Sequence, residues 1–213
     1  MVTEPLGATR EFNVSLRRLF FAGPKVSAVW KPLLSAVLVQ AGWFACAFEP
    51  VWNRPGLGAG FVALVVAVHL LLVPQRAAFV RWLAFAAAWG TVVDSLQAAR
   101  GVLLFHEPLV GGFVCPLWFT ALWVNFACVW PLTLSWLAPR PTLAATLGLF
   151  AGPASYYGGA ALGALALGQP VERSLPLIGL AWAASMAVWC RVATQIHLFG
   201  AGPGGSDARG SGN

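Results

Sequence analysis

Six long apolar segments, separated by short turn-forming stretches, constrain this chain more than any other feature. Each segment reaches or approaches the ~20 residues that a helix needs to cross ~30 Å of hydrocarbon. Proline and glycine, which favour turns, recur in the breaks between them. The segments run at about 32–48, 56–74, 77–105, 113–137, 142–167 and 174–199. We therefore expect an all-α integral membrane protein, folded as a bundle of about six transmembrane helices.

The amino-acid composition supports a membrane protein over a soluble one. Hydrophobic residues make up 59% of the chain and charged residues 9%, whereas soluble domains carry about 25% charged residues. The net charge of +6 comes from basic residues that flank the apolar segments, so a nucleic-acid partner is not expected. Membrane lipid is the expected partner, and other membrane proteins are a second candidate.

The distribution of basic residues orients the predicted helices. The topology puts Arg54, Arg100 and Arg173 on one side of the membrane and all other Lys and Arg residues on the opposite side. Because Lys and Arg accumulate on the cytoplasmic side of membrane proteins, we expect both termini in the cytoplasm. The loops 49–55, 106–112 and 168–173 would then lie outside.

The chain divides into three predicted parts. Residues 1–31 form a basic cytoplasmic or interfacial segment, 32–199 the six-helix transmembrane domain, and 200–213 a disordered Gly-rich tail. Within the first part, residues 11–21 place apolar side chains on one helical face, which favours a short helix on an anionic membrane surface. A disordered basic tail is the alternative. No cleavage pattern follows the first apolar segment, so it is expected to remain as an uncleaved anchor.

Asp94 lies in the third apolar segment, within WGTVVDSLQAARG (89–101). An aspartate at the centre of a spanning helix costs about 2.5–3.5 kcal/mol on insertion scales. Val92 and Leu96 lie on the opposite side of the helix. The residues that share the face of Asp94 are all small or polar: Gly90, Thr91, Gln97, Ala98 and Gly101. We therefore expect Asp94 to face protein, at a seam where another helix approaches closely.

Polar residues on two further helices fall at a similar depth. Counting 1.5 Å per residue from the cytoplasmic end places Asn125 and Tyr156 near the level of Asp94. Asp94 is thus a candidate catalytic residue, supported by Tyr156 and Asn125. A structural carboxylate, hydrogen-bonded to Tyr156 or Asn125, is the alternative. Aromatic residues form the candidate binding site: Trp43, Trp118, Trp123, Tyr156, Tyr157 and Trp182.

The fourth and fifth segments carry further packing signals. Pro131 lies inside the fourth segment, where it leaves the carbonyl of Ala127 free and predicts a kink. Trp118 and Trp136 lie near the two ends of this segment, as interface anchors do. Trp123 and Trp130 lie within it and are expected to line the bundle interior or a groove. In the fifth segment, small residues at every fourth position predict close contact with a neighbouring helix.

Cysteine and histidine spacing suggests no metal or cofactor. The four cysteines form no C-x-x-C pair, which argues against zinc and thioredoxin-type sites. Cys46 and Cys115 could share the outer surface, but nothing in the sequence sets them at bonding distance. His69, His106 and His197 are predicted at different levels, so they form no haem or metal site. Walker, dinucleotide, zinc-protease and G-x-S-x-G motifs are missing from the sequence.

Five stretches carry a family resemblance: QAGWFACAF (40–48), VHLLL (68–72), WGTVVDSLQAARGVLLF (89–105), PLWFTALWVNFACVWPLTLSWL (116–137) and AGPASYYGGAALGAL (151–165). Over about 33–198 the chain resembles the bacterial membrane family of the domain of unknown function 2878. The resemblance implies a small protein of the bacterial inner membrane. It also implies recurrent polar and aromatic positions at Trp43, Asp94, Trp118, Trp123, Gly152, Pro153 and Tyr156.

Three functions remain open at the level of sequence. The genes beside family members, for cyclopropane-type fatty-acid synthases and flavin oxidoreductases, imply an accessory factor or enzyme of membrane-lipid modification, in which Asp94 would handle a proton. The second hypothesis is a small permease or ion-coupled carrier, in which Asp94 would bind a cation or proton. The third is a structural or assembly partner of a membrane complex, in which Asp94 holds the helices together.

Overall fold

The computed structural model describes residues 26–107 and 109–199. The expected surface helix over 11–21 and the Gly-rich tail lie outside the described residues. Within them the chain forms six α-helices: α2 (Val26–Val51), α3 (Leu57–Leu72), α4 (Arg76–Ala99), α5 (Leu117–Val129), α6 (Pro141–Ala161) and α7 (Val171–Gln195). Helix α2 begins ahead of the expected residue 32 and includes Pro32, whose carbonyl accepts a hydrogen bond from the Thr133 hydroxyl at 3.1 Å.

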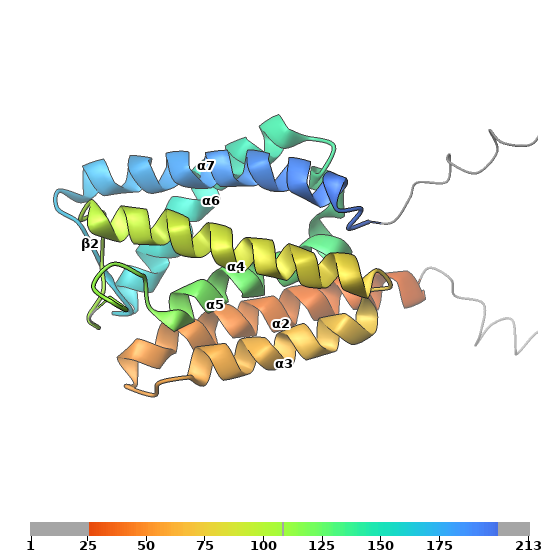
Figure 1. Ribbon diagram of the computed structural model, residues 1–213, viewed down its shortest axis with the longest axis horizontal. Helices are drawn as coiled ribbons and strands as arrows, with labels where there is room; N and C mark the ends of the chain where they lie inside the picture. The colour runs from red at the N-terminus through yellow and green to blue at the C-terminus, as the bar shows by residue number, and fades with distance from the viewer. Residues whose placement is uncertain (1–25, 108, 200–213) are drawn as a thin grey trace, which may run out of the picture.

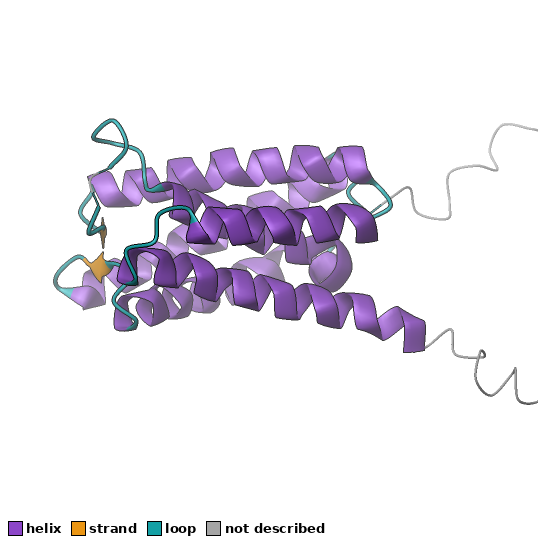
Figure 2. Cartoon of the chain, turned by 90° about the horizontal axis from the view of Figure 1, so that it is seen from below, coloured by secondary structure: helices purple, strands orange, loops and turns teal. Residues whose placement is uncertain are grey.

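The helices run side by side along one long axis, and the start of α2 and the end of α7 lie at the same end of the bundle (Figures 1 and 2). Helix α2 packs against α3 and α5, and α5 also packs against α4. Helices α6 and α7 form a tightly packed pair, which contacts the rest of the bundle through α4 and through aromatic side chains of α5. The fold thus consists of two groups of helices. The first group is α2 to α5, the second is α6 with α7, and the second packs against α4 and α5 of the first.

The fold is that of a helical membrane protein. Four stretches of helix are long and apolar enough to cross a bilayer: Val29–Val51, Arg76–Ala99, Leu117–Leu137 and Val171–Gln195. Helix α3 is apolar but has 16 residues, fewer than the ~20 of a typical span. Helix α6 is rich in Gly, Ala and Thr, which lowers its hydropathy, and it is not among the four.

The third apolar segment is only partly helical. Helix α4 ends at Ala99, and Gly101 adopts a φ of 68°, a conformation that favours glycine. The chain then enters β1 (Leu103–Leu104), which pairs antiparallel with β2 (Ala166–Leu167) between α6 and α7. The third segment is long for one span, which predicts either a tilted helix or a turn at its end after Gly101, and the structure shows that the chain leaves the helix here. The small sheet ties the α4–α5 and α6–α7 connections together.

Pro131 changes the course of the fourth segment, as its position predicted. Regular α5 ends at Val129, and a π-helical turn over Trp130–Leu134 and a 3₁₀ turn over Ser135–Leu137 follow. The carbonyl of Ala127, which Pro131 cannot engage, accepts a hydrogen bond from the Trp82 indole at 3.0 Å. A neighbouring helix therefore satisfies the backbone group that the proline leaves free.

Other polar residues are absorbed by the fold. Glu49 is buried and accepts hydrogen bonds from the backbone N–H groups of Gly56 at 3.0 Å and Gly58 at 2.7 Å, so its charge caps the start of α3. His69 is fully buried and bonds Ser35 and the Val65 carbonyl, which identifies it as a packed histidine. All four cysteines are free and buried.

Candidate functional site

Asp94 lies at the centre of a hydrogen-bond network that joins three helices. Its side chain is fully buried on α4. Oδ1 accepts hydrogen bonds from Gln97 Nε2 at 2.9 Å and from the Tyr156 hydroxyl at 2.7 Å. Oδ2 accepts one from Trp123 Nε1 at 2.5 Å. A carboxylate accepts only, and all three partners can donate, so each of these three hydrogen bonds fits an ionised Asp94.

Close helix contacts bring these partners together. A Cβ atom at Gly90 would overlap the Trp123 ring, and one at Gly152 would overlap Trp182. Glycine at these two positions therefore lets α4 approach α5 and α6 approach α7. On the face of Asp94, Gly90 and Gln97 are buried and Thr91 and Ala98 are partly buried, whereas Val92 is 58% and Leu96 52% exposed on the opposite side. Asp94 thus faces protein, as the helical pattern predicted.

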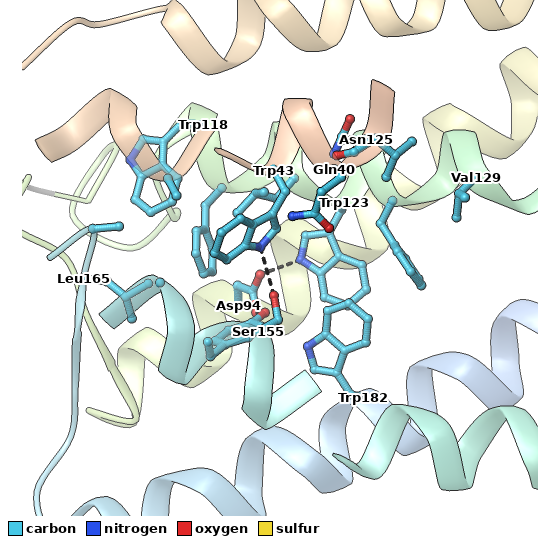
Figure 3. Close-up of a pocket in the computed structure, with 18 of the residues that line it drawn as sticks. Gln40, Trp43, Asp94, Trp118, Trp123, Asn125, Val129, Ser155, Leu165 and Trp182 are labelled. Carbon is cyan, nitrogen blue, oxygen red and sulfur yellow. Dashed lines mark hydrogen bonds between the residues drawn. The ribbon is translucent and has the colours of Figure 1, made fainter. Parts of the chain in front are cut away.

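A pocket of about 350 Å³ lies beside this network (Figure 3). Its floor is α5, its walls are α2 on one side and α6 with Trp182 of α7 on the other, and Asp94 contributes from α4. Residues of both walls, Gln40 among them, are partly or fully exposed, so the pocket opens to the surface of the bundle. We call this pocket the groove. Its size falls in the range of roughly 300–1,000 Å³ for small-molecule sites.

One hydrogen bond crosses the groove between its walls. The Trp43 indole on α2 donates to the Ser155 hydroxyl on α6 at 2.9 Å (Figure 3). Each of these helices packs mainly against other elements, α2 against α3 and α5, and α6 against α7. The Trp43–Ser155 bond therefore closes the groove at a point where the two helix groups are otherwise loosely joined.

Aromatic side chains line most of the groove. The rings of Trp123 and Trp182 stack with centroids 4.7 Å apart and planes at 18°. Tyr156 meets Phe119 and Trp182 edge to face, with centroids at 5.5 and 6.2 Å. Among the described residues, Asp94 is the sole lining residue of the Asp, Glu, Lys, Arg and His types. The groove is thus apolar and aromatic, with one acidic group in its wall.

The structure gathers most of the residues singled out from the sequence. Trp43, Asp94, Trp118, Trp123, Tyr156 and Trp182 all line the groove. Trp118 is only 2% exposed and packs against Phe105 and Phe119. Its expected role as a membrane-interface anchor is therefore wrong, whereas Trp136 is 47% exposed near the other end of the same segment.

Two sequence-based assignments need correction. Asn125 lines the groove, but its Nδ2 donates to the Val39 carbonyl at 2.8 Å, and its amide lies against Gly42. It joins α5 to α2 and is not among the described residues that donate a hydrogen bond to Asp94, so depth alone placed it too near the carboxylate. Tyr157 is 59% exposed and does not line the groove. It follows Tyr156 directly in the helix, so its side chain points about 100° away from that of Tyr156.

Other groove residues were missed. Gln40 and Ser155 lie in short polar interruptions of apolar stretches, a signal that could have identified them. The helical pattern places Gln97 on the same face as Asp94, but it does not predict the hydrogen bond between them. In the part of the chain that the structure describes, no group of His, Cys, Asp or Glu residues is arranged to hold a metal ion.

Comparison with known proteins identifies the family of this chain. The model of a family described as Protein of unknown function (DUF2878) matches residues 32–188. This range contains every residue that lines the groove. No curated protein and no solved structure is detectably similar to the chain.

Proposed function

This chain belongs to the family of proteins of unknown function DUF2878, and from its groove we propose that it binds the hydrocarbon part of a membrane lipid and serves membrane-lipid modification. It does so as an accessory factor or as an enzyme. The observation that carries this proposal is the aromatic groove beside Asp94, which opens on the side of a bundle of apolar helices.

We place the protein in the bacterial inner membrane with six spans and both termini in the cytoplasm. The position of the start of α2 and the end of α7 at one end of the bundle supports this topology (Figure 1). Lys31, Arg76, Arg140 and Arg191 lie near helix ends on that side, as the positive-inside rule requires. In this orientation the groove faces hydrocarbon, so a lipid chain reaches it from within the bilayer.

The groove offers two chemical features to a bound chain. The stacked Trp123 and Trp182 rings provide a flat apolar wall, and Asp94 with Tyr156 provides a site for a proton at the middle of that wall. In the enzyme form of the proposal, Asp94 acts as acid or base on a chain held against the rings, and Tyr156 positions it. In the accessory form, the groove presents the chain to a partner enzyme.

A groove-filling variant tests the proposal in cells. Ala36 lines the groove, whereas the adjacent Val37 is 57% exposed and points away. We expect a deletion strain to lose a lipid species in acyl-chain lipidomics. The wild type and Val37→Trp should restore it, and Ala36→Trp should not, with all proteins verified in the membrane. Unchanged lipids after deletion, under stress as well as at rest, would contradict the proposal.

A second candidate, a proton-coupled carrier, is favoured by one observation. The Gln97 Oε1 atom is buried without a hydrogen-bond partner among the described residues. Reversal of this amide would turn an acceptor towards a protonated Asp94, so the network can serve both protonation states. Proton flux in liposomes that is lost in Asp94→Asn would favour this function over lipid modification.

The third hypothesis is a structural or assembly partner. It is supported by the three protein donors that bond both oxygens of Asp94. It makes Asp94 a link between α4, α5 and α6. Groove-filling by Ala36→Trp should then leave the cellular function intact, provided that the variant is stable. Recovery of an intact complex from membranes measures this directly.

A further inference from the structure

We propose that the groove selects a neutral lipid with a hydroxyl or carbonyl oxygen and rejects anionic lipids. This inference rests on the proposed function, since it names the class of lipid that the groove binds. It follows from the polar atoms that remain available on the groove wall and from the charges that lie near them.

The groove wall carries polar atoms that no protein partner satisfies. Asn125 Oδ1 is a buried acceptor without a donor among the described residues, and two other side chains keep a donor available. Trp43 donates to Ser155 Oγ, which leaves the hydroxyl proton of Ser155 available. Gln40 is exposed at the groove and brings its amide beside Trp43 and Trp123 (Figure 3). A ligand oxygen can accept from these groups.

The charges at the groove exclude an anion. Of the described residues that line it, none is Lys, Arg or His, and Asp94 carries the one acidic side chain. A buried carboxylate or phosphate without a positive partner is strongly disfavoured in a low-dielectric site. The negative charge of an ionised Asp94 adds repulsion. A hydroxyl or carbonyl group meets neither penalty.

The depth of the polar atoms points to the same class. Gln40 lies near the middle of α2 (Val26–Val51), and Ser155 lies well inside α6 (Pro141–Ala161). A phospholipid headgroup stays at the membrane surface, whereas an uncharged lipid can bring its oxygen to this level. Its chain would then lie along the stacked Trp123 and Trp182 rings.

Competitive photo-crosslinking tests the selectivity. The full chain is placed in phosphatidylcholine nanodiscs and labelled with a diazirine derivative of hexadecanol, and the labelled peptides are identified by mass spectrometry. Competitors of equal chain length are hexadecanol, a methyl ketone, hexadecane, hexadecanoate at a pH where it is ionised, and hexadecyl phosphate. We expect labelling of α2 and α6, and about tenfold weaker competition by both anions and by hexadecane than by hexadecanol or the ketone.

Matched variants connect this preference to the groove. Gln40→Leu and Ser155→Ala should each weaken competition by hexadecanol about three- to tenfold, the effect of one hydrogen bond, and leave hexadecane unchanged. Gln75→Leu, at the start of α4 and outside the groove, should change neither.

The outcomes separate the two proposals. Equal competition by hexadecanoate, or by hexadecane, overturns the selectivity and leaves a lipid-binding groove. Wild-type affinity for hexadecanol in both groove variants overturns the assigned polar contacts. Labelling that avoids the groove with every probe contradicts the proposed function as well.

Discussion

Tryptophan side chains have different roles in two regions of the bundle: they pack closely against one another in one region and border a cavity in the other. The first, which we call the dry cluster, consists of Trp82, Trp130 and Trp189, all at most 1% exposed. Their ring centroids lie 4.8 to 5.8 Å apart, so each ring fills the space beside the others. The second region is the groove, where the rings border a cavity of about 350 Å³.

The difference arises from the helices that carry the rings. The dry cluster joins α4, the π-helical turn and α7, whereas the groove lies where α2 and α6 face each other across α5. The two regions meet at Trp123, whose ring centroid is 5.6 Å from that of Trp189. Aromatic content alone therefore does not create a binding site. Here the site arises because α2 and α6, on either side of the rings, each pack mainly against other helices and leave space between them.

Truncation of Trp82 should have the largest effect on stability. Trp82→Ala removes a fully buried ring and leaves the Ala127 carbonyl without its indole partner. We expect the free energy of unfolding to fall by about 3–5 kcal/mol, measured by thermal unfolding in one detergent. Trp136→Ala, at a 47% exposed position, is the control. If Trp43→Ala in the half-buried groove wall costs as much as Trp82→Ala, the comparison between the regions fails.

Asp94 variants should show how much stability the hydrogen bonds to its carboxylate provide. Asp94→Leu removes the acceptor for Gln97, Trp123 and Tyr156. The free energy of unfolding should therefore fall by about 3 kcal/mol. Asp94→Asn should cost about 1 kcal/mol or less, because its oxygen can face Trp123 while its NH₂ donates to Tyr156 and to a reversed Gln97 amide. Thermal unfolding measures the stability of both variants. If Asp94→Asn loses as much stability as Asp94→Leu, the assigned hydrogen bonds are contradicted.

Glycine substitutions should test the close contacts behind the groove. A Cβ at Gly90 would enter the Trp123 ring, whereas nothing lies within 4 Å of one at Gly60. Gly90→Ala should therefore lower the free energy of unfolding by about 1–3 kcal/mol. Gly60→Ala, in the middle of α3, should raise it by about 0.4–1 kcal/mol. Equal effects in an unfolding assay would show that α4 and α5 are not in tight contact at the groove.

The fold was predictable where a physical rule acts within one segment. Helical periodicity placed Asp94 towards protein, and Pro131 predicted the break that the structure shows over Trp130–Leu134. Gly101 marked the end of α4 in the same way. Each of these predictions depends on residues within one or two helical turns. Such rules need no knowledge of which helices are neighbours.

The site was predictable only in part, because it depends on which helices are neighbours. Depth counting brought Tyr156 to Asp94 correctly, but it also brought Asn125, which binds α2 instead. Depth carries no information on rotation about the helix axis or on helix order. The Trp43–Ser155 bond, between residues 112 positions apart, shows the same limit. No local pattern predicts that α2 and α6 face each other.

The smallest effect should come from the bond that closes the groove. Ser155 and Ser185 each accept an indole hydrogen bond at 2.9 Å, from Trp43 and Trp89 respectively. Ser185 is 1% exposed, so Ser185→Ala should lower the free energy of unfolding by about 1 kcal/mol. Ser155→Ala should cost about 0.5 kcal/mol, because Ser155 and Trp43 are both only half-buried and the unpaired indole is therefore penalised less.

The same pair of variants can reveal motion that stability does not. Spin labels at Val37 on α2 and Ala154 on α6, both exposed, report the distance across the groove. Ser155→Ala removes the one bond described between these walls and should broaden the distance distribution, while Ser185→Ala should leave it unchanged. An identical distribution in both variants would mean that the two helix groups are held together elsewhere. The groove would then be as rigid as the dry cluster, and a lipid would have to enter it without any separation of α2 from α6.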